Sequence, residues 1–161
     1  MGFLSSLFGN ANNAYEFTKT GYEYYKKGDF NNALIYYRKA LDVDPNYYIA
    51  YNNIGIIYQN QGDISKAMSY YNKAISINPD NSQTYNNIGV IYFKNKDFEK
   101  AMNFYKKAIH LSPDYGDAYY NLGILYLELD DSNSCVLCVR KAAQLGDKDA
   151  ISFCKKNNVK W

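Results

Sequence analysis

The sequence is poor in the residue types that build metal centres, disulfide frameworks and catalytic dyads. Its 161 residues include only 3 cysteines and 1 histidine. Three thiols are too few for a disulfide framework, and an odd number of them suits a reducing compartment better than a secreted one. The single histidine, His110, has no acid or nucleophile at a useful spacing. We therefore expect a cytoplasmic protein without a metal ion or other cofactor.

The sequence also lacks a charge excess and a long apolar run. Its 18 Lys and Arg residues nearly balance its 16 Asp and Glu residues, which leaves a formal net charge of +2. Because the charges are interspersed, no basic stripe indicates nucleic acid as a partner. No stretch is long and apolar enough to predict a transmembrane helix. With 47% hydrophobic residues, the chain can nevertheless form an ordered core.

Proline is scarce, and the few prolines mark a repeat. All 3 prolines recur at a spacing of 34 residues, at positions 45, 79 and 113. Four glycines share this period: Gly21, Gly55, Gly89 and Gly123. A period of this length is typical of helix–turn–helix units. One such unit cannot bury its apolar face alone, so stacked copies are required.

Residues 48–81 carry the clearest copy of the repeat. Counting Tyr48 as position 1, small residues stand at positions 8, 20 and 27, where two antiparallel helices would cross, and aromatic residues at positions 4, 11 and 24. Gly62 can end the first helix in a left-handed conformation, and Asp63 can cap the second helix. Pro79 then stops the second helix. This pattern resembles the tetratricopeptide repeat (TPR).

The resemblance covers residues 14–146 and implies an all-α fold, an α-solenoid of four TPR-like helix hairpins followed by a C-terminal capping helix. We place the repeats at residues 14–47, 48–81, 82–115 and 116–146, and the capping helix with its tail at residues 147–161. In the third repeat, Lys96 replaces the turn glycine, which costs about 1 kcal/mol or shifts the turn onto Asn95. The fourth repeat departs further, because Asp130 replaces the turn glycine and Val139 replaces the aromatic residue.

A short apolar segment, residues 1–13, precedes the first repeat. Its phenylalanines and leucines lie within Phe3–Phe8, before a break rich in asparagine. The segment lacks the basic start and the longer apolar core of a secretory signal. Gly2 and Ser6 match an N-myristoylation pattern, so membrane contact is expected only if Gly2 is acylated. Alternatively, these apolar residues cap the first helix hairpin.

The polar residues that could suggest a catalytic site have a structural explanation. Four aspartates recur at position 16, each after a turn residue and before a helix, and helix capping accounts for all of them: Asp29, Asp63, Asp97 and Asp131. Cys135 and Cys138 lie inside a predicted helix, where we expect small buried thiols instead of a zinc or redox site. No phosphate-binding loop or nucleophile motif is present. We therefore predict that the protein is not an enzyme, and a thiol-dependent enzyme is the least favoured alternative.

The TPR resemblance also implies a binding groove. In this family, the first helix of each hairpin lines a concave groove with positions 2, 5, 6, 9, 12 and 13. Position 6 supplies amides that can both donate to and accept from a peptide backbone: Asn53, Asn87 and Asn121. Positions 9 and 12 supply a mainly apolar floor: Tyr22, Tyr25, Ile56, Gln59, Val90, Phe93, Ile124 and Leu127. Alternatively, asparagine is simply frequent at position 6 of such repeats.

These features predict a non-catalytic protein-interaction module that binds a peptide or a partner helix in its groove, as an adaptor, co-chaperone or scaffold. The asparagines favour an extended peptide held by its main chain, and an amphipathic helix on the apolar floor is the competing binding mode. The alternative function is a homo-oligomeric scaffold. Such a scaffold would self-associate through Phe3–Phe8 or through Tyr36 and Tyr70.

One known binding mode of the family is not expected. Members that bind the acidic C-termini of heat-shock chaperones use lysine and arginine at defined groove positions. In this sequence the corresponding positions of the first three repeats hold no cation: Thr18, Tyr22, Asn53, Gln83 and Asn87. Without paired cations, the carboxylates of such a peptide would lose water and gain no charge-assisted partner.

Overall fold

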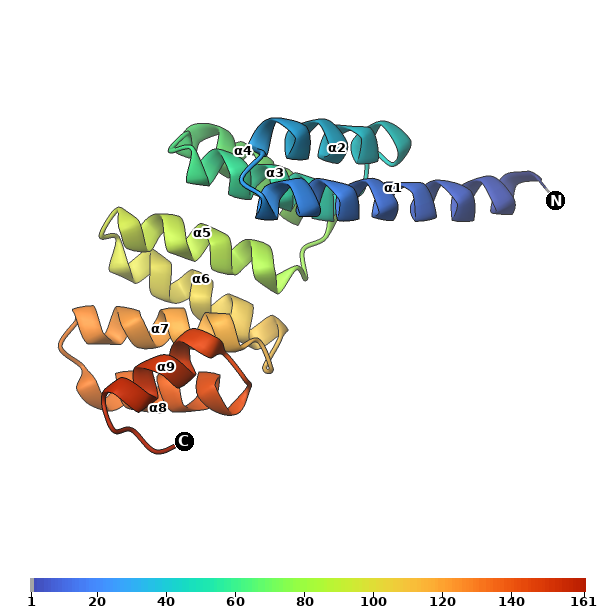
Figure 1. Cartoon of the computed structure of the whole chain (residues 1–161). Helices are drawn as coiled ribbons and strands as arrows, with labels where there is room; N and C mark the ends of the chain where they lie inside the picture. The colour runs from blue at the N-terminus through green and yellow to red at the C-terminus, as the bar shows by residue number, and fades with distance from the viewer. Residues whose placement is uncertain (1) are drawn as a thin grey trace. The chain divides into compact units, whose positions relative to one another are not determined.

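The computed structural model describes the backbone of residues 2–161 and the side chains of residues 13–161. The described residues form nine α-helices and no strands (Figure 1). The chain divides into two compact units, Met1–Pro79 and Asp80–Trp161, here termed unit 1 and unit 2.

Unit 1 consists of two antiparallel helix hairpins. The first pairs α1 (Gly2–Lys26) with α2 (Phe30–Val43), and the second pairs α3 (Tyr48–Asn60) with α4 (Ile64–Ile77). The helical backbone of α1 begins at Gly2, earlier than the start at residue 14 that the sequence predicts. A glycine inside a helix costs only about 1 kcal/mol, so the break expected there does not follow from composition alone. The side chains of Phe3–Phe8 and the acylation of Gly2 lie outside the described residues.

Unit 2 consists of two further hairpins and one additional helix. The hairpins pair α5 (Ser82–Lys94) with α6 (Phe98–Leu111) and α7 (Gly116–Glu128) with α8 (Ser132–Gln144), and α9 (Lys148–Lys156) follows. At the hairpin turns, Lys96 and Asp130 both adopt left-handed backbone with a φ of 59°. Asn95 keeps a φ of −82°, so the turn is not shifted onto it.

The second helix of every hairpin begins at an aspartate, as predicted. The side chain of each aspartate accepts a hydrogen bond from the backbone N–H three residues later, at 3.0 to 3.2 Å: Asp29, Asp63, Asp97 and Asp131. These bonds satisfy one of the N–H groups that a helix start leaves unpaired. Hydrogen bonds from the residue three positions later also lower the pKa of all four carboxyl groups.

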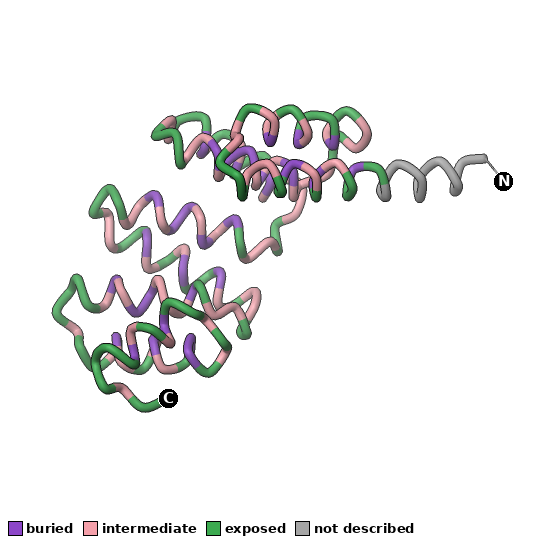
Figure 2. Tube along the Cα trace, in the orientation of Figure 1, coloured by how far each residue is buried: buried purple, intermediate pink, exposed green. Residues whose placement is uncertain are grey.

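The periodic glycines allow the two helices of a hairpin to touch. A Cβ atom added at Gly55 would lie only 2.6 Å from Cε1 of Tyr71, whose side chain is fully buried. The same contact recurs between Gly21 and Tyr37, between Gly89 and Tyr105, and, with a smaller partner, between Gly123 and Val139. The period of 34 residues therefore has a steric cause, because any larger side chain would overpack the hairpin. Figure 2 shows buried positions recurring along the hairpins of both units.

Aromatic rings stack between the two helices of the first three hairpins. The ring centroids lie 5.3 to 5.4 Å apart in the pairs Tyr24 with Tyr36, Tyr58 with Tyr70, and Tyr92 with Phe104. Tyr36 and Tyr70 are therefore partly buried inside unit 1. In the fourth hairpin, the position of the second ring is occupied by Cys138.

Helix α9 packs on α8 and completes the core of unit 2. Ala150 and Cys154 are fully buried in a cluster with Cys135 and Val139 of α8. Ile151 and Phe153 are partly buried against this cluster. The guanidinium Nε of Arg140 donates to the carbonyl oxygen of Lys160 at 2.7 Å, which holds the following tail against α8.

The predicted all-α fold of four helix hairpins and a C-terminal helix is confirmed. Within the described residues, none of the helices combines the length and the hydrophobicity that crossing a bilayer requires.

Candidate functional site

Unit 1 contains a hollow of about 260 Å³ at its first helices, here termed the unit 1 hollow. It is lined by residues of α1, of the loop before α3, and of α3: Tyr15, Thr18, Lys19, Tyr22, Tyr47, Ile49 and Asn53. All of these except Tyr47 stand at repeat positions 2, 5, 6 or 9. These are positions that the family resemblance assigns to the groove.

The unit 1 hollow is aromatic and carries little charge. The rings of Tyr15 and Tyr22 are 56% and 49% exposed. Lys19 is exposed and is the only charged residue among those that line the hollow. Thr18 is only 7% exposed, and its Oγ1 has no hydrogen-bond partner among the described residues. The hollow therefore combines exposed rings with an unsatisfied buried hydroxyl group.

Two of the predicted site residues of unit 1, Tyr22 and Asn53, are brought together in this hollow. The ammonium of Lys26 lies over the Tyr22 ring, 5.2 Å from its centroid. Ile56 lies one turn after Asn53 on α3 and is partly buried. Both α3 residues can therefore contact a ligand that lies along α1 and α3.

The other two predicted residues of unit 1 are used inside the unit. The hydroxyl of Tyr25 accepts a hydrogen bond from Nδ2 of Asn60 at 3.0 Å. Oε1 of Gln59 accepts one from the hydroxyl of the buried Tyr71 at 2.6 Å. Each bond stabilises unit 1 and uses only part of the polar group, since the hydroxyl of Tyr25 and the amide nitrogen of Gln59 can still donate.

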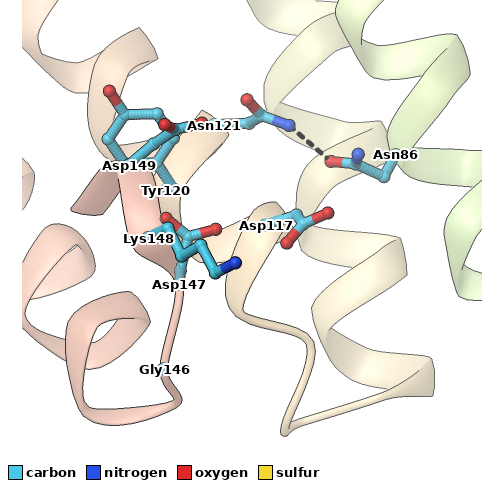
Figure 3. A pocket seen from close by; sticks show the side chains of 8 residues that line it. All are labelled: Asn86, Asp117, Tyr120, Asn121, Gly146, Asp147, Lys148 and Asp149. Atoms are coloured by element: carbon cyan, nitrogen blue, oxygen red, sulfur yellow. Dashed lines mark hydrogen bonds between the residues drawn. The ribbon is translucent and has the colours of Figure 1, made fainter. Parts of the chain in front are cut away.

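Unit 2 contains a second hollow of about 420 Å³, here termed the unit 2 hollow (Figure 3). Its lining comes from α5, α7 and the start of α9: Asn86, Asp117, Tyr120, Asn121, Gly146, Asp147, Lys148 and Asp149. The residues from α5 and α7 again stand at repeat positions 2, 5 and 6. The remaining residues belong to the turn between α8 and α9 and to the first turn of α9.

Asn121, one of the amides predicted at position 6, is part of an amide pair. Its Nδ2 donates to Oδ1 of Asn86 on α5 at 2.9 Å, as the dashed line in Figure 3 shows. Asn86 is 5% exposed, and its own Nδ2 donates to the hydroxyl of Tyr115 at 3.5 Å. The amide nitrogen of Asn121 therefore supplies a hydrogen-bond donor to the buried side-chain oxygen of Asn86. Asn87, the position 6 residue of α5, is partly buried.

Carboxylates dominate the charge of the unit 2 hollow. Asp117 from the first turn of α7 lies within hydrogen-bonding reach of Asp147, which caps α9 by accepting from the N–H of Ala150 at 2.6 Å. Burial raises the pKa of Asp117, and the hydrogen bond to Asp147 and its negative charge raise it further. Asp149 also lines the hollow, and Lys148 is the only cation among the lining residues. The hollow therefore disfavours anions.

Some of the residues predicted to form the apolar floor of the groove in unit 2 pack into the core of that unit. Val90 and Phe93 pack against the buried cluster of α6 and α7, and the Phe93 ring lies 5.8 Å from that of Phe98. Ile124 is partly buried, whereas Leu127 is 42% exposed. Val90 and Phe93 are three residues apart on α5, and Ile124 and Leu127 are three residues apart on α7. Each pair therefore shares one face of its helix.

The three cysteines are free thiols. Cys135 and Cys154 are buried, and Cys138 is partly buried. Burial raises the pKa of all three thiols, whereas reactive cysteines have a lowered pKa. In the part of the chain that the structure describes, no group of three or more potential metal ligands comes together.

Several lining residues were missed by the sequence prediction, which concentrated on positions 6, 9 and 12. In unit 1 these are Tyr15, Thr18, Tyr47 and Ile49, whereas Lys19 stands at position 6. In unit 2 they are Asn86, Asp117, Tyr120 and residues 146–149. Positions 2 and 5 belong to the family's groove pattern, so the signal for most of them was present. The contribution of α9 had no signal, because its place against α7 depends on the fold.

Comparison with known proteins places these repeats in a family. A tetratricopeptide repeat model matches residues 48–81 and 82–115. A TPR repeat model matches residues 21–62, and a further tetratricopeptide repeat model matches residues 104–136. Together these matches span residues 21–136. No curated protein sequence matches the chain significantly.

Solved structures share the fold. PilF of Pseudomonas aeruginosa has a TM-score of 0.77 at 24% identity over 85% of this chain, which spans 63% of the PilF chain. MamA has a TM-score of 0.66 at 25% identity, covering 89% of this chain and 84% of its own. The first TPR domain of Spaghetti (RPAP3), solved with the HSP90 peptide SRMEEVD, has a TM-score of 0.65 at 24% identity. The match covers 74% of this chain and 95% of the RPAP3 chain. The repeat spacing, the hairpins and the family matches agree, and the chain belongs to the tetratricopeptide repeat family.

Proposed function

We propose that this chain is a non-catalytic protein-interaction module that binds a segment of a partner protein along the first helices of its hairpins. The observation that supports the proposal is the location of the two hollows. They lie in different units, yet the first-helix residues that line both stand at repeat positions 2, 5 and 6, with Tyr22 alone at position 9. TPR proteins are in general interaction modules, so a recurrent open surface of this kind suits partner binding.

The first helices offer the chemistry that an extended segment needs. Asn53 and Asn121 line the two hollows, and amides can both donate to and accept from a main chain. The ring of Tyr22 is exposed in the unit 1 hollow, and Leu127 is exposed on α7, so both can cover apolar side chains. Main-chain bonds give affinity with little demand on sequence, and the apolar contacts then select the side chains.

An amphipathic helix docked on the apolar residues is the competing mode, and affinity measurements on variants distinguish the two. We expect the triple variant Asn53→Ala, Asn87→Ala and Asn121→Ala to lose about 0.5–1.5 kcal/mol for each hydrogen bond to an extended ligand. A helical ligand satisfies its own backbone and should hardly respond to this variant. Phe93→Ala should weaken both modes.

The matched control is Asn103→Ala, an exposed asparagine on the second helix α6. Circular dichroism and light scattering must first show that the variants remain helical and monodisperse, because Asn121→Ala removes the donor to the buried Asn86. Loss of affinity with Phe93→Ala alone would discard main-chain recognition. Loss with none of the first-helix variants would refute the proposed surface.

The proposed ligand differs from that of the RPAP3 domain, whose HSP90 peptide SRMEEVD ends in acidic residues. The groove positions that hold lysine and arginine in chaperone-binding members hold no cation in the first three repeats of this chain. The unit 2 hollow also carries three carboxylates. The terminal carboxylates of such a peptide would be desolvated without a charged partner. We therefore propose that this chain does not bind acidic chaperone C-termini, and a low-micromolar Kd in calorimetry would contradict this.

The alternative functions receive less support. Self-association through Tyr36 and Tyr70 would have to use rings that already stack on Tyr24 and Tyr58. A thiol-dependent enzyme would need a lowered thiol pKa, and burial raises that of Cys135 and Cys138 instead. We propose an adaptor or scaffold role for the interaction module on these grounds.

A further inference from the structure

The unit 2 hollow is large enough and accessible enough to receive a side chain of a bound segment. Its volume of about 420 Å³ lies within the roughly 300–1,000 Å³ of sites that hold a ligand. Asp117 and Asp149 are exposed, and Tyr120, Asn121 and Asp147 are only partly buried. The polar groups of the hollow can therefore be contacted from outside the chain.

The hollow carries a negative charge that its own cation does not neutralise. Three carboxylates and one ammonium group leave two negative charges in excess among the lining residues. Among the described residues, none of the ion pairs involves Asp117, Asp147 or Asp149. Lys148 is exposed, and it forms no ion pair with these carboxylates either. The charge of the hollow therefore favours a cation from a partner.

The helices around the hollow supply no second cation to its lining. The only charged residue of α5 is Lys94, in its last turn, and α7 contains no lysine or arginine. The basic residues in the last turns of α6 and α8, His110 and Lys141, are exposed and do not line the hollow. Asp114, in the loop before α7, adds a further carboxylate to this end of the unit.

Two of the carboxyl groups lie close enough to need something positive between them. Asp117 lies within hydrogen-bonding reach of Asp147, and burial together with this contact raises the pKa of Asp117. Neighbouring carboxyl groups repel each other when both are ionised, unless a proton or a cation lies between them. A cation from a partner can therefore take the place of the shared proton.

The arrangement of the acceptors suits a guanidinium group better than an ammonium group. Asp117 belongs to the first turn of α7 and Asp147 to the start of α9, and the Tyr120 ring lines the same hollow (Figure 3). A guanidinium group presents several N–H donors in one plane, so it can bond to two carboxylates at once and stack on an aromatic ring. An ammonium group is a compact and strongly hydrated point charge.

We infer that the unit 2 hollow receives an arginine side chain of the partner segment, an inference that rests on the proposed function. The guanidinium group lies between Asp117 and Asp147 and donates to both. Asp149 adds a further negative charge, and Tyr120 offers its ring to the guanidinium plane.

The test compares peptides that carry arginine or its neutral analogue. The probes are three acetylated and amidated peptides of glycine and serine with one central residue, which is arginine, citrulline or lysine. Citrulline keeps the length and the planar end of arginine and removes its charge. Chemical-shift titration at pH 7 and low salt measures Kd even when binding is weak and maps the residues that respond.

Two protein variants form a matched pair. Asp117→Asn removes a carboxylate of the hollow, and Asp130→Asn removes an exposed one at the turn between α7 and α8, away from the lining residues. Both variants change the net charge of the chain by the same amount. A third variant, Lys148→Ala, removes the ammonium group that competes with the arginine.

We expect the wild type to bind the arginine peptide about tenfold more tightly than the citrulline peptide, the preference that one charge-assisted hydrogen bond gives. Asp117→Asn should lower this preference to about threefold or less, since one of the two acceptors loses its charge. Asp130→Asn should retain the preference, and Lys148→Ala should strengthen the binding of the arginine peptide. The lysine peptide should bind more weakly than the arginine peptide, and shifts should map to the starts of α7 and α9.

Equal affinity for the arginine and citrulline peptides, a full arginine preference in Asp117→Asn, or no binding of the arginine peptide would overturn the inference. An equal loss in Asp130→Asn would also overturn it, because net charge and not the hollow would then attract the peptide. Equal or tighter binding of the lysine peptide would refute the choice of a guanidinium group. A recovered partner that still loses affinity with Phe93→Ala would leave the proposed function intact in all these cases.

Discussion

At the residue scale, two hairpin turns hold side chains in a conformation that favours glycine. Lys96 and Asp130 have a φ of 59°, whereas the equivalent residues of unit 1, Gly28 and Gly62, have φ values of 76° and 80°. The left-handed conformation costs a residue with a Cβ atom about 1–2 kcal/mol, and glycine avoids this cost. These turns are therefore the places where unit 2 can be stabilised most simply.

We expect Lys96→Gly and Asp130→Gly each to raise the free energy of unfolding of unit 2 by about 1 kcal/mol or less, because glycine also gains entropy in the unfolded chain. Urea unfolding followed by circular dichroism measures the change. The matched control is Gly62→Ala, where no atom lies within 4 Å of the added Cβ and only the backbone conformation is penalised. If Gly62→Ala stabilises unit 1, or if the two glycine substitutions destabilise unit 2, the assignment of turn strain is incorrect.

The carboxyl pair in the unit 2 hollow predicts a pH effect. The pKa of Asp117 is raised in the folded state by burial and by Asp147, so the folded chain binds this proton more tightly than the unfolded chain. Its contribution to stability is therefore fully present below the unfolded pKa of about 3.9 and is lost as the pH rises through the folded pKa. The capping aspartates act in the opposite direction, because their pKa is lowered.

Asp117→Asn removes this titration and should raise the melting temperature of unit 2 at pH 7. The difference from the wild type should shrink towards zero as the pH falls below about 4, where Asp117 is protonated. Thermal unfolding of the wild type and of Asp117→Asn between pH 3 and pH 8 measures both the difference at pH 7 and its loss at low pH. A difference that stays constant across this range would show that the variant acts through packing and not through charge.

At the element scale, α9 covers the apolar side of α8. Ala150 and Cys154 are fully buried, whereas Ser152 on the same helix is exposed. Deleting residues 147–161 would expose Cys135 and its cluster to water and remove the Asp147 cap. Helix α9 therefore contributes to unit 2 through burial as well as through its own backbone bonds.

We expect this deletion to reduce hydrogen-exchange protection in α7 and α8 and to leave α3 and α4 unchanged. Ala150→Asp should reproduce much of the loss, because it buries a charge without a partner. Ser152→Asp is the control on the exposed side and should have little effect. Unchanged protection in residues 116–145 after the deletion would mean that α9 does not stabilise this hairpin.

The elements also show which parts of the structure a single sequence can predict. The glycine period, the capping aspartates and the hairpins follow from local sterics and hydrogen bonds, so they are visible at fixed spacings. The start of α1 at Gly2 was not predicted, since a glycine and several asparagines weaken a helix without excluding it. The sequence also does not distinguish Lys96 from Asn95 at the third turn, whereas the backbone angles assign the left-handed conformation to Lys96.

The candidate site was less accessible to prediction than the fold. Asn53 and Asn121, which stand at position 6, line the two hollows. The pairing of Asn121 with Asn86 was not visible, because it joins two helices 35 residues apart. The meeting of Asp117 and Asp147 depends on where α9 packs, which no repeat pattern encodes. Three of the four charged residues of the unit 2 hollow, Asp147, Lys148 and Asp149, therefore lie outside the repeat.

At the scale of the whole molecule, two units with the same repeat carry different surfaces. The unit 1 hollow is aromatic with a single ammonium group, and the unit 2 hollow is polar with three carboxylates and one ammonium group. The formal net charge of +2 hides this difference. A partner segment that contacts the two units would meet different chemistry at each, which gives specificity without any change in the fold.

The most direct test of partner binding along the first helices is a map of photo-crosslinks. Four exposed apolar residues allow a matched comparison: Tyr22 on α1 and Leu127 on α7, which are 49% and 42% exposed, and Ile35 on α2 and Leu137 on α8, which are 47% and 64% exposed. Each is replaced singly by benzoyl-phenylalanine, and crosslinking to the recovered partner is quantified at equal protein concentration. We predict crosslinks from the Tyr22 or Leu127 position and none above background from the Ile35 and Leu137 positions. Crosslinks that arise equally or preferentially from the two second-helix positions would contradict the account.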